Sequence, residues 1–238
     1  MTDLDLVQEE LRELARYVER VVFDEWYGNS AELLDAEYGA YEPSTVFFCV
    51  IDHLRALPAG MLRITLPSAR GFKTLHDIAD VWGQPYEEVL ARTGLEWDLT
   101  RVWDTITIAV TKDYRGKSTD GLITMSLLQS LAQALVMCGG QTLLTILDLH
   151  VLDLFQATVC EPWQRFPGVE PIDYLDSPAS IPVFTNFDEY KPRMAATDAA
   201  MYDLIFNARG FEAAMTPPKW APILRAAGLE PRPTSVTR

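Results

Sequence analysis

Apolar positions recur at two spacings along the chain, and these spacings predict its first helix and its first strands. Residues 4–24 place apolar side chains three or four positions apart, which is the period of an amphipathic helix. Residues 45–52 (TVFFCVID) and 59–66 (AGMLRITL) are apolar runs of strand length that are rich in β-branched and aromatic residues. Because a hairpin-length segment joins the two runs, we expect them to pair antiparallel.

The rest of the chain alternates helical and extended patterns. Helices are expected over residues 30–38, with Ser30 as N-cap, and over 74–82, 86–91, 118–139, 151–159, 197–207 and 218–227. Strands are expected over residues 105–110, 142–149 and 181–187. This order predicts an α/β fold, with one domain over residues 1–190 and a helical extension, residues 191–238, packed on the same domain.

Composition narrows the functional classes. The 238 residues are 48% apolar and 23% charged, which suits a globular protein with a real core. A formal net charge of -14 argues against a nucleic-acid binder, because phosphate binding needs a basic face. The three cysteines are far apart and form no CxxC pair, as is typical of reduced thiols. With neither a secretory signal nor a membrane-spanning run in the sequence, we expect a cytoplasmic protein.

The segment 103–121 (WDTITIAVTKDYRGKSTDG) carries the most chemical information. A strand runs into a tight turn around Gly116, and a helix follows. The first N–H groups of a helix have no partner within the helix and bind anionic oxygens, and Arg115 and Lys117 add positive charge there. Taken alone, the turn is equally compatible with a solvated helix start.

This segment resembles the pantetheine-binding loop of Gcn5-related (GNAT-like) acyltransferases, in which a V-x-x-x-Y-R-G-x-G pattern precedes a helix. Val110 and the Tyr114-Arg115-Gly116 triplet match it, whereas Ser118 replaces the next glycine. The resemblance implies a mixed, mostly antiparallel sheet in which two neighbouring strands splay apart around the thioester arm of an acyl donor. The donor-binding residues that it implies are Ile108, Ala109, Val110, Tyr114, Arg115, Gly116, Lys117 and Ser118.

Other segments resemble one branch of this superfamily, the autoinducer synthases and N-acyl amino acid synthases. They are residues 63–67 (RITLP), 75–77 (LHD), a Trp–acid pair before the strand at 105–110, and residues 172–189. This likeness implies transfer of an acyl group to the amine of a small acceptor. The product would be an acyl-homoserine-lactone-like signal or an N-acyl amino acid.

The Trp–acid pair fits that branch in two registers. Residues 97–101 (WDLTR) keep both the acid and the arginine of the pattern, whereas Trp103-Asp104 keeps only the acid. Spacing to the Tyr114-Arg115-Gly116 loop favours the second register. Asp104 is therefore placed ahead of Asp98 as the catalytic acid–base residue. Such a residue is needed because an attacking amine must lose a proton to a group within reach. A backbone N–H of residues 108–110 would hold the oxyanion.

The acceptor-binding residues inferred from the resemblance are Arg63, Asp35, Glu37 and Arg101. Arg63 would pair with an acceptor carboxylate, and the acidic cluster of Asp35, Glu37 and Glu42 would attract a cationic acceptor. The structural alternatives are a cross-strand ion pair for Arg63 and a solvated helix end for Asp35 and Glu37.

The sequence therefore predicts an N-acyltransferase that uses acyl-CoA or the acyl-phosphopantetheine of a carrier protein as substrate and binds no permanent cofactor or metal. A carrier would dock on Lys112, Arg115 and Lys117, and a homodimer is left open. The alternative is a GNAT-like domain that has lost catalysis and binds a ligand or partner. Ser118, Asp120 and the absent arginine of the second register keep that alternative open.

Overall fold

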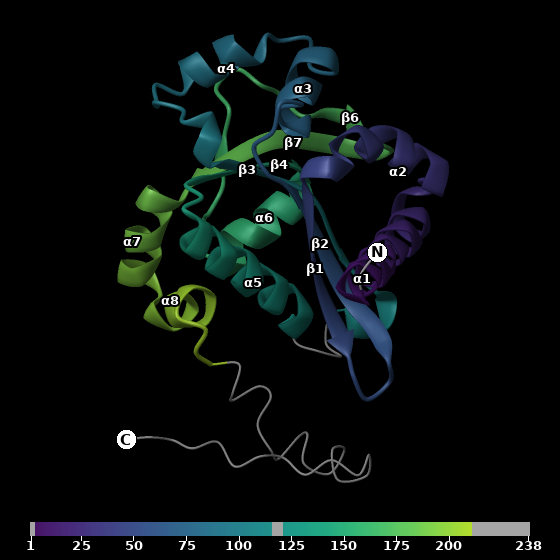
Figure 1. The fold of residues 1–238 in the computed structure, drawn as a ribbon. Helices are drawn as coiled ribbons and strands as arrows, with labels where there is room; N and C mark the ends of the chain where they lie inside the picture. The colour runs from purple at the N-terminus through teal and green to yellow at the C-terminus, as the bar shows by residue number, and fades with distance from the viewer. Residues whose placement is uncertain (1–2, 116–120, 211–238) are drawn as a thin grey trace.

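The computed structural model describes residues 3–115 and 121–210, which form one mixed sheet with helices on both faces (Figure 1). The strands are β1 (Thr45–Asp52), β2 (Leu57–Thr65), β3 (Val102–Val110), β4 (Thr142–Asp148), β5 (Gln164–Arg165), β6 (Ile172–Tyr174) and β7 (Ser177–Asn186). Their order is β1-β2-β3-β4-β7-β5, and β6 pairs with the first part of β7. The strands β3 and β4 run parallel, and the other described pairs are antiparallel.

Two groups of helices cover the sheet (Figure 1). On one face lie α1 (Asp3–Tyr27), α2 (Ala31–Tyr38), α3 (Lys73–Asp80) and α4 (Tyr86–Arg92). On the other lie α5 (Leu122–Cys138), α6 (Leu149–Thr158), α7 (Phe187–Thr197) and α8 (Ala199–Phe206). The short 3-10 helices Gly39–Ser44, Leu99–Arg101 and Lys112–Tyr114 connect elements.

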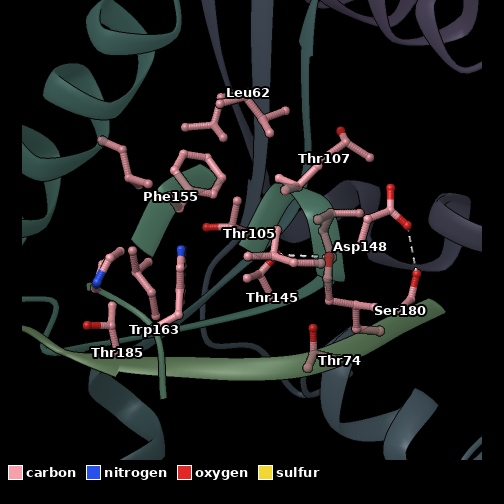
Figure 2. A pocket seen from close by; sticks show the side chains of 18 of the residues that line it. Leu62, Thr74, Thr105, Thr107, Thr145, Asp148, Phe155, Trp163, Ser180 and Thr185 are labelled. Carbon is pink, nitrogen blue, oxygen red and sulfur yellow. Dashed lines mark hydrogen bonds between the residues drawn. The ribbon is translucent and has the colours of Figure 1, made fainter. Parts of the chain in front are cut away.

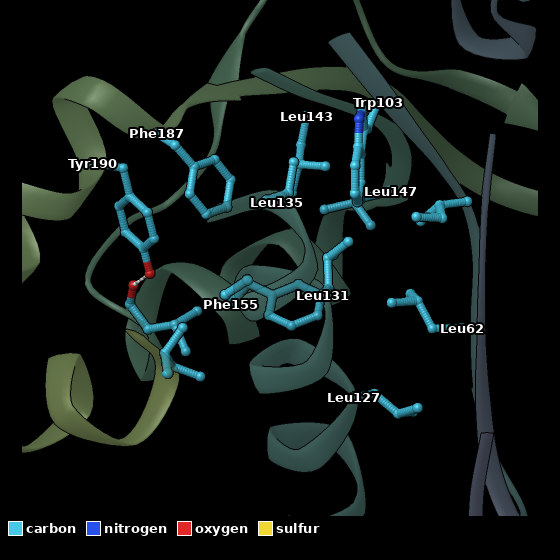
Figure 3. Packing of buried hydrophobic residues seen from close by; sticks show 14 of the residues in the cluster. Leu62, Trp103, Leu127, Leu131, Leu135, Leu143, Leu147, Phe155, Phe187 and Tyr190 are labelled. Carbon is cyan, nitrogen blue, oxygen red and sulfur yellow. Dashed lines mark hydrogen bonds between the residues drawn. The ribbon is translucent and has the colours of Figure 1, made fainter. Parts of the chain in front are cut away.

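The largest apolar core lies between the sheet and the group α5 to α8. Leu127, Leu131 and Leu135 of α5 pack toward Leu143 and Leu147 of β4 (Figure 3). Burying each such side chain contributes roughly 1.5–3 kcal/mol. A smaller core sits under α3 and α4, and α1 packs on β2 and β3. Each face of the central strands is therefore covered.

Local sequence signals set several element boundaries. The side chain of Ser30 accepts a hydrogen bond from the backbone N–H of Leu33 and caps α2, as predicted. Gly139 ends α5 in the left-handed conformation, with φ of 72°, which glycine adopts without a steric penalty. Asn186 caps α7 through the N–H of Asp188.

The predicted α/β fold with a mostly antiparallel sheet is confirmed, and the first hairpin pairs as expected. Strand β3 begins three residues earlier than predicted, because Val102 and Trp103 already pair with β4. The helix α7 was not predicted, since Pro192 lies inside it. The predicted helix 197–207 corresponds to α8, which Asp198 caps. The predicted helix 218–227 and the expected start of α5 at residues 118–120 lie outside the described residues.

The proposed boundary between residues 190 and 191 falls within α7. Met194 of α7 and Ile205 and Phe206 of α8 belong to the main core. Gln129 and Gln133 of α5 donate hydrogen bonds to backbone carbonyls at the end of α8. Residues 191–206 are thus part of the same packed body as the sheet.

Candidate active site

The parallel strands β3 and β4 pair along only part of their lengths. Their register runs from Val102 opposite Thr142 to Thr105 opposite Thr145. Beyond that point β3 continues to Val110 and β4 to Asp148 without pairing to each other. The edges that face one another there carry backbone N–H and C=O groups with no ladder partner, and buried groups of this kind require one. The predicted divergence of two neighbouring strands is present.

A cavity of about 190 Å³ occupies this opening. Its walls come from the diverging parts of β3 and β4, from the neighbouring strands β2 and β7, and from helices of both faces, including α1, α3, α5, α6, α7 and α8. Figure 2 shows Phe155 and Trp163 at one side of the cavity and Asp148 with Ser180 at the other. The cavity therefore has two ends of different chemistry, and each end is built by different elements.

The apolar end is lined from α5, α6 and the α7–α8 region. Its lining side chains include Leu62, Leu128, Leu131, Ala132, Leu147, Val151, Phe155, Phe187 and Ile205. Several of these are also members of the main core, as Figure 3 shows for Leu131, Leu147 and Phe155. The arrangement offers an unbranched apolar chain a surface that water does not solvate well.

Three polar atoms in the cavity wall have no partner. They are the hydroxyls of Thr105 and Thr185 and the indole N–H of Trp163. Both threonines are buried, with 8% and 2% of their surface exposed. Buried polar groups without partners are uncommon in folded proteins, and here all three border the same cavity.

The acidic end is organised by Asp148, the last residue of β4. Its carboxylate accepts a hydrogen bond from the Tyr27 hydroxyl at 2.5 Å. It also accepts one from the Ser180 hydroxyl at 3.2 Å, which Figure 2 shows. Tyr27 is the last residue of α1 and Ser180 lies in β7, so three distant segments meet at this carboxylate. Burial raises the pKa of Tyr27, and the bond to Asp148 raises it further, so this phenol keeps its proton.

A second charged group completes this end. The Lys73 ammonium contacts both carboxylate oxygens of Asp77 at 2.8 and 2.7 Å, Glu37 at 2.8 Å and the Tyr174 hydroxyl at 3.1 Å. Burial acts to lower the pKa of Lys73, but its ion pairs with Asp77 and Glu37 outweigh it and the pKa is raised. Burial raises the pKa of Asp77. Lys73, Asp77 and Tyr174 line the cavity.

The two predicted catalytic acids lie away from the cavity lining. Asp104 is fully buried on the α3 side of β3 and accepts hydrogen bonds from the Thr74 N–H at 2.8 Å and the Thr74 hydroxyl at 2.6 Å. Burial raises the pKa of Asp104 to about 6. Asp98 is exposed and caps the short helix before β3 through Thr100. Thr74, which Asp104 holds, does line the cavity.

The residues predicted to bind an acceptor are engaged within the protein. Arg63 is buried and pairs with Glu19 at 2.6 Å and Glu42 at 2.9 Å, and its guanidinium lies over Tyr38 and Phe47. Asp35 pairs with Arg16 and Arg20, and Glu37 pairs with Lys73. Arg101 donates to the carbonyl of Gly139. Of these side chains, Glu37 contacts Lys73 and Arg63 contacts Tyr38, and both Lys73 and Tyr38 belong to the cavity wall.

The residues predicted to bind the donor are partly at the opening. Ile108 lines the cavity, whereas Ala109 packs under α1 and the Val110 carbonyl accepts a hydrogen bond from Arg115. The Tyr114 hydroxyl donates to Asp52 at 2.6 Å, and the Arg115 guanidinium lies over Trp26, 5.0 Å from the ring centre. Gly116, Lys117 and Ser118 lie outside the described residues.

Sequence reasoning missed Asp148, Tyr27 and Ser180 as members of one site. Asp148 had a readable signal, because it is the charged last residue of an otherwise uncharged strand and lies at the carboxyl end of a parallel pair, where ligands commonly bind in α/β sheets. Tyr27 and Ser180 carried no comparable signal, since only the tertiary fold brings them to Asp148. His150, two residues further on, is exposed and does not line the cavity.

In the part of the chain that the structure describes, no cluster of three His, Cys, Asp or Glu side chains has an arrangement that could hold a metal ion. None of the helices in the same residues combines the length and the apolar character needed to cross a bilayer.

Similarity to solved structures is clear, although neither a protein-family model nor a curated protein matches the sequence. FeeM, an N-acyl amino acid synthase from uncultured soil microbes, superposes with a TM-score of 0.57 and 16% identity over 77% of this chain and 95% of that one. BjaI, a CoA-dependent acyl-homoserine lactone synthase, superposes with a TM-score of 0.52 and 16% identity over 81% of this chain and 85% of that one. The chain thus has the GNAT-like fold, and within it resembles the branch of N-acyl amino acid and autoinducer synthases.

Proposed function

We propose that this protein is an N-acyltransferase that moves an acyl group from a thioester donor to the amine of a small acceptor. The observation that carries the proposal is the cavity between the diverging parts of β3 and β4, which is apolar at one end and acidic at the other. The hydrophobic chain of an acyl thioester suits the apolar end, and the amine of an acceptor suits the acidic end. The activities of FeeM and BjaI, which share the fold, support the same reaction class.

The donor would enter between the two strands. Pantetheine carries two amide groups, and the facing edges of β3 beyond Thr105 and β4 beyond Thr145 offer unpaired backbone groups for them. The acyl chain would then lie among Leu131, Leu147 and Phe155 at the apolar end. The carbonyl carbon would sit where the strands part, next to the acidic end.

Asp148 is the proposed proton acceptor, in place of Asp104. Its carboxylate borders the cavity and has only hydroxyl partners, whereas the Asp104 carboxylate is enclosed by Thr74. The acceptor ammonium would lose one proton to Asp148 and attack the thioester carbon. As the C–S bond breaks, an amide forms and the nitrogen loses its second proton. One of the two protons ends on the released thiol and the other goes to solvent.

The carrier of the acyl group is part of the test. Purified protein is incubated with acyl-CoA and acyl-carrier-protein donors of several chain lengths and with pooled amines, and thiol release is measured beside mass spectrometry of the products. We expect thiol release that depends on the amine, together with an N-acylated product. Absence of thiol release from every donor would overturn the proposal and favour a ligand-binding module.

A matched pair of variants ties that activity to the cavity. Ala132 lines the apolar end and is buried, so Ala132→Phe should fill the space that a long acyl chain needs and shift the preference to short donors. Met137, one and a half turns along the same helix, is 82% exposed, and Met137→Phe serves as the control. An unchanged chain-length profile in Ala132→Phe, with an unchanged fold by circular dichroism, would place the acyl chain elsewhere.

A further inference from the structure

Three hydroxyl groups at the acidic end of the cavity already donate hydrogen bonds to other groups of the protein. The Tyr27 hydroxyl donates to Asp148 and the Thr74 hydroxyl donates to Asp104, while the Ser180 hydroxyl donates either to Asp148 at 3.2 Å or to the Ser177 hydroxyl at 3.0 Å. A hydroxyl has one hydrogen, and an ionised carboxylate can only accept. What these three groups retain for a ligand is therefore lone pairs, and they select for a ligand that donates hydrogen bonds.

The hydrogens of the Lys73 ammonium group at this end are also used in contacts within the protein. Lys73 is the one cationic side chain among the described residues that line the cavity, and an ammonium has three hydrogens. Asp77, Glu37 and Tyr174 take all three. A ligand carboxylate would thus meet no uncommitted ammonium hydrogen here, and it would lie beside carboxylates of the same charge.

The charges at this end do not balance. Asp77 and Asp148 border the cavity against the single charge of Lys73, which Glu37 also shares. No lysine, arginine or histidine in the described residues forms an ion pair with Asp148. The site lacks a positive charge that a ligand can supply.

The cavity wall also contains hydroxyl groups that have no hydrogen-bond partner. The hydroxyls of Thr105 and Thr185 are buried in its wall without a hydrogen bond. Unpaired buried hydroxyls are costly to the protein alone, so these two are independent evidence that a ligand contacts this wall.

From these contacts we infer that the acyl acceptor is a cationic amine that carries no free carboxylate, an inference that rests on the proposed function. Its ammonium group would lie against Asp148, with the oxygens of Tyr27, Ser180 and Thr74 around it. Diamines, simple aliphatic or aromatic amines and amino-acid amides fit this description. Zwitterionic amino acids do not, because their carboxylate would lie beside Asp148 and Asp77 and meet no uncommitted ammonium hydrogen there.

The test uses acceptors that differ only in the carboxylate. One series is phenylalanine, phenylalaninamide and phenylethylamine, and the other is lysine, lysinamide and cadaverine. With the full chain and one acyl donor, we expect kcat/KM for the amide and the decarboxylated amine to exceed that of the amino acid by on the order of 10-fold or more. Equal or faster acylation of the amino acids would overturn the inference and leave the acyltransferase proposal in place.

Calorimetric titration of the same compounds without an acyl donor separates recognition from catalysis. Tighter binding of the amines than of the amino acids, with no acyl transfer to any of them, would sink the acyltransferase proposal and keep the recognition of a carboxylate-free amine. Neither binding nor transfer with any compound would overturn both.

A variant of Glu37, a partner of Lys73, tests whether the occupied ammonium of Lys73 is the reason why carboxylates are rejected. Glu37→Gln removes one of the carboxylates that occupy the Lys73 ammonium, and Glu37 is partly exposed, so the substitution should be tolerated. The preference against the amino acid should then shrink several-fold relative to the wild-type chain. Glu32→Gln, at an exposed position of the same helix, is the control. If Glu37→Gln folds and its selectivity equals that of the control, the committed ammonium is not what rejects carboxylates.

Discussion

The two halves of the β3–β4 pair have the same strands but different chemistry. In the paired half, from Val102 to Thr105, the ladder closes the sheet, and the Asp104 carboxylate is sealed under α3 by two hydrogen bonds from Thr74. In the diverging half, the sheet opens, and the Asp148 carboxylate borders a cavity with hydroxyl partners only. The paired half thus holds the enclosed carboxylate, and the diverging half holds the carboxylate that borders the cavity.

Other side chains connect the diverging half of β3 to α1. Thr107, in the unpaired half of β3, donates its hydroxyl hydrogen to Glu19 of α1, and Glu19 also pairs with Arg63 of β2. Burial raises the pKa of Glu19, and the charge of Arg63 opposes that shift. This buried group ties β3 to α1 on the side away from β4. Arg63, which the sequence suggested as an acceptor ligand, lies at the centre of this support.

The largest expected effect separates the two aspartates. Because a positioned general base contributes about 100- to 10,000-fold, Asp148→Asn should lower kcat/KM by that range. Asp104→Asn should have a much smaller effect per folded molecule. Initial rates of thiol release, with Asp153→Asn on the exposed face of α6 as control, measure the difference. If Asp104→Asn lost more activity than Asp148→Asn, the roles of the two halves would be reversed.

The next largest effect concerns the support of the open half. Glu19→Gln should lower the free energy of unfolding by about 3–5 kcal/mol, because it leaves the Arg63 charge buried with an incomplete set of partners. Asp35→Asn removes an ion pair whose carboxylate side chain is 48% exposed, and should cost at most about 1 kcal/mol. Urea denaturation of the two variants gives the comparison. Equal losses would mean that the buried pair does not stabilise α1 on the sheet.

A smaller effect should appear in the pH dependence of stability. Asp104 has a pKa raised by burial to about 6, against 3.8 for the ordinary carboxyl. The folded state therefore favours the protonated form, and this contribution, fully present below about pH 4, is lost as pH rises to about 6. The shift of about two pKa units corresponds to about 3 kcal/mol. The variant Asp104→Asn has no carboxyl group at this position to titrate. Between about pH 4 and about pH 6, the free energy of unfolding of the wild-type chain should therefore fall by up to about 3 kcal/mol relative to that of the variant.

Chemical denaturation at a series of pH values measures that curve. The matched variant for it is Asp98→Asn, because Asp98 is exposed and its substitution should leave no such difference between pH 4 and 6. A constant offset between wild type and Asp104→Asn would show that Asp104 is ionised throughout, and the paired half would then hold a charge.

The sequence predicted the fold of this protein better than the residues of its candidate active site. Hydrophobic periodicity identified the first hairpin and most helices, and the Tyr114-Arg115-Gly116 resemblance indicated the diverging strands. The Trp–acid motif, a local pattern, places the predicted acid–base residue at Asp104, which lies outside the cavity lining. Asp148, Tyr27 and Ser180 lie in three segments separated by up to 153 positions, between Tyr27 and Ser180. Which side of a strand a carboxylate faces, and what covers it, depends on tertiary packing that no local pattern records.

The smallest expected effect lies where the diverging half of β3 ends. Lys112 is 81% exposed there, and Glu25 of α1 lies 3.6 Å from its ammonium and 3.3 Å from the Arg115 guanidinium. Glu25 thus offsets part of the positive charge on which a carrier protein was expected to dock. With an acyl-carrier-protein donor, Lys112→Glu should raise the apparent KM by about three- to tenfold and weaken its dependence on salt. With acyl-CoA it should change little, and Arg209→Glu, at an exposed site beyond α8, is the control. Equal effects of both variants with the carrier donor would place the docking surface away from the open end of the strands.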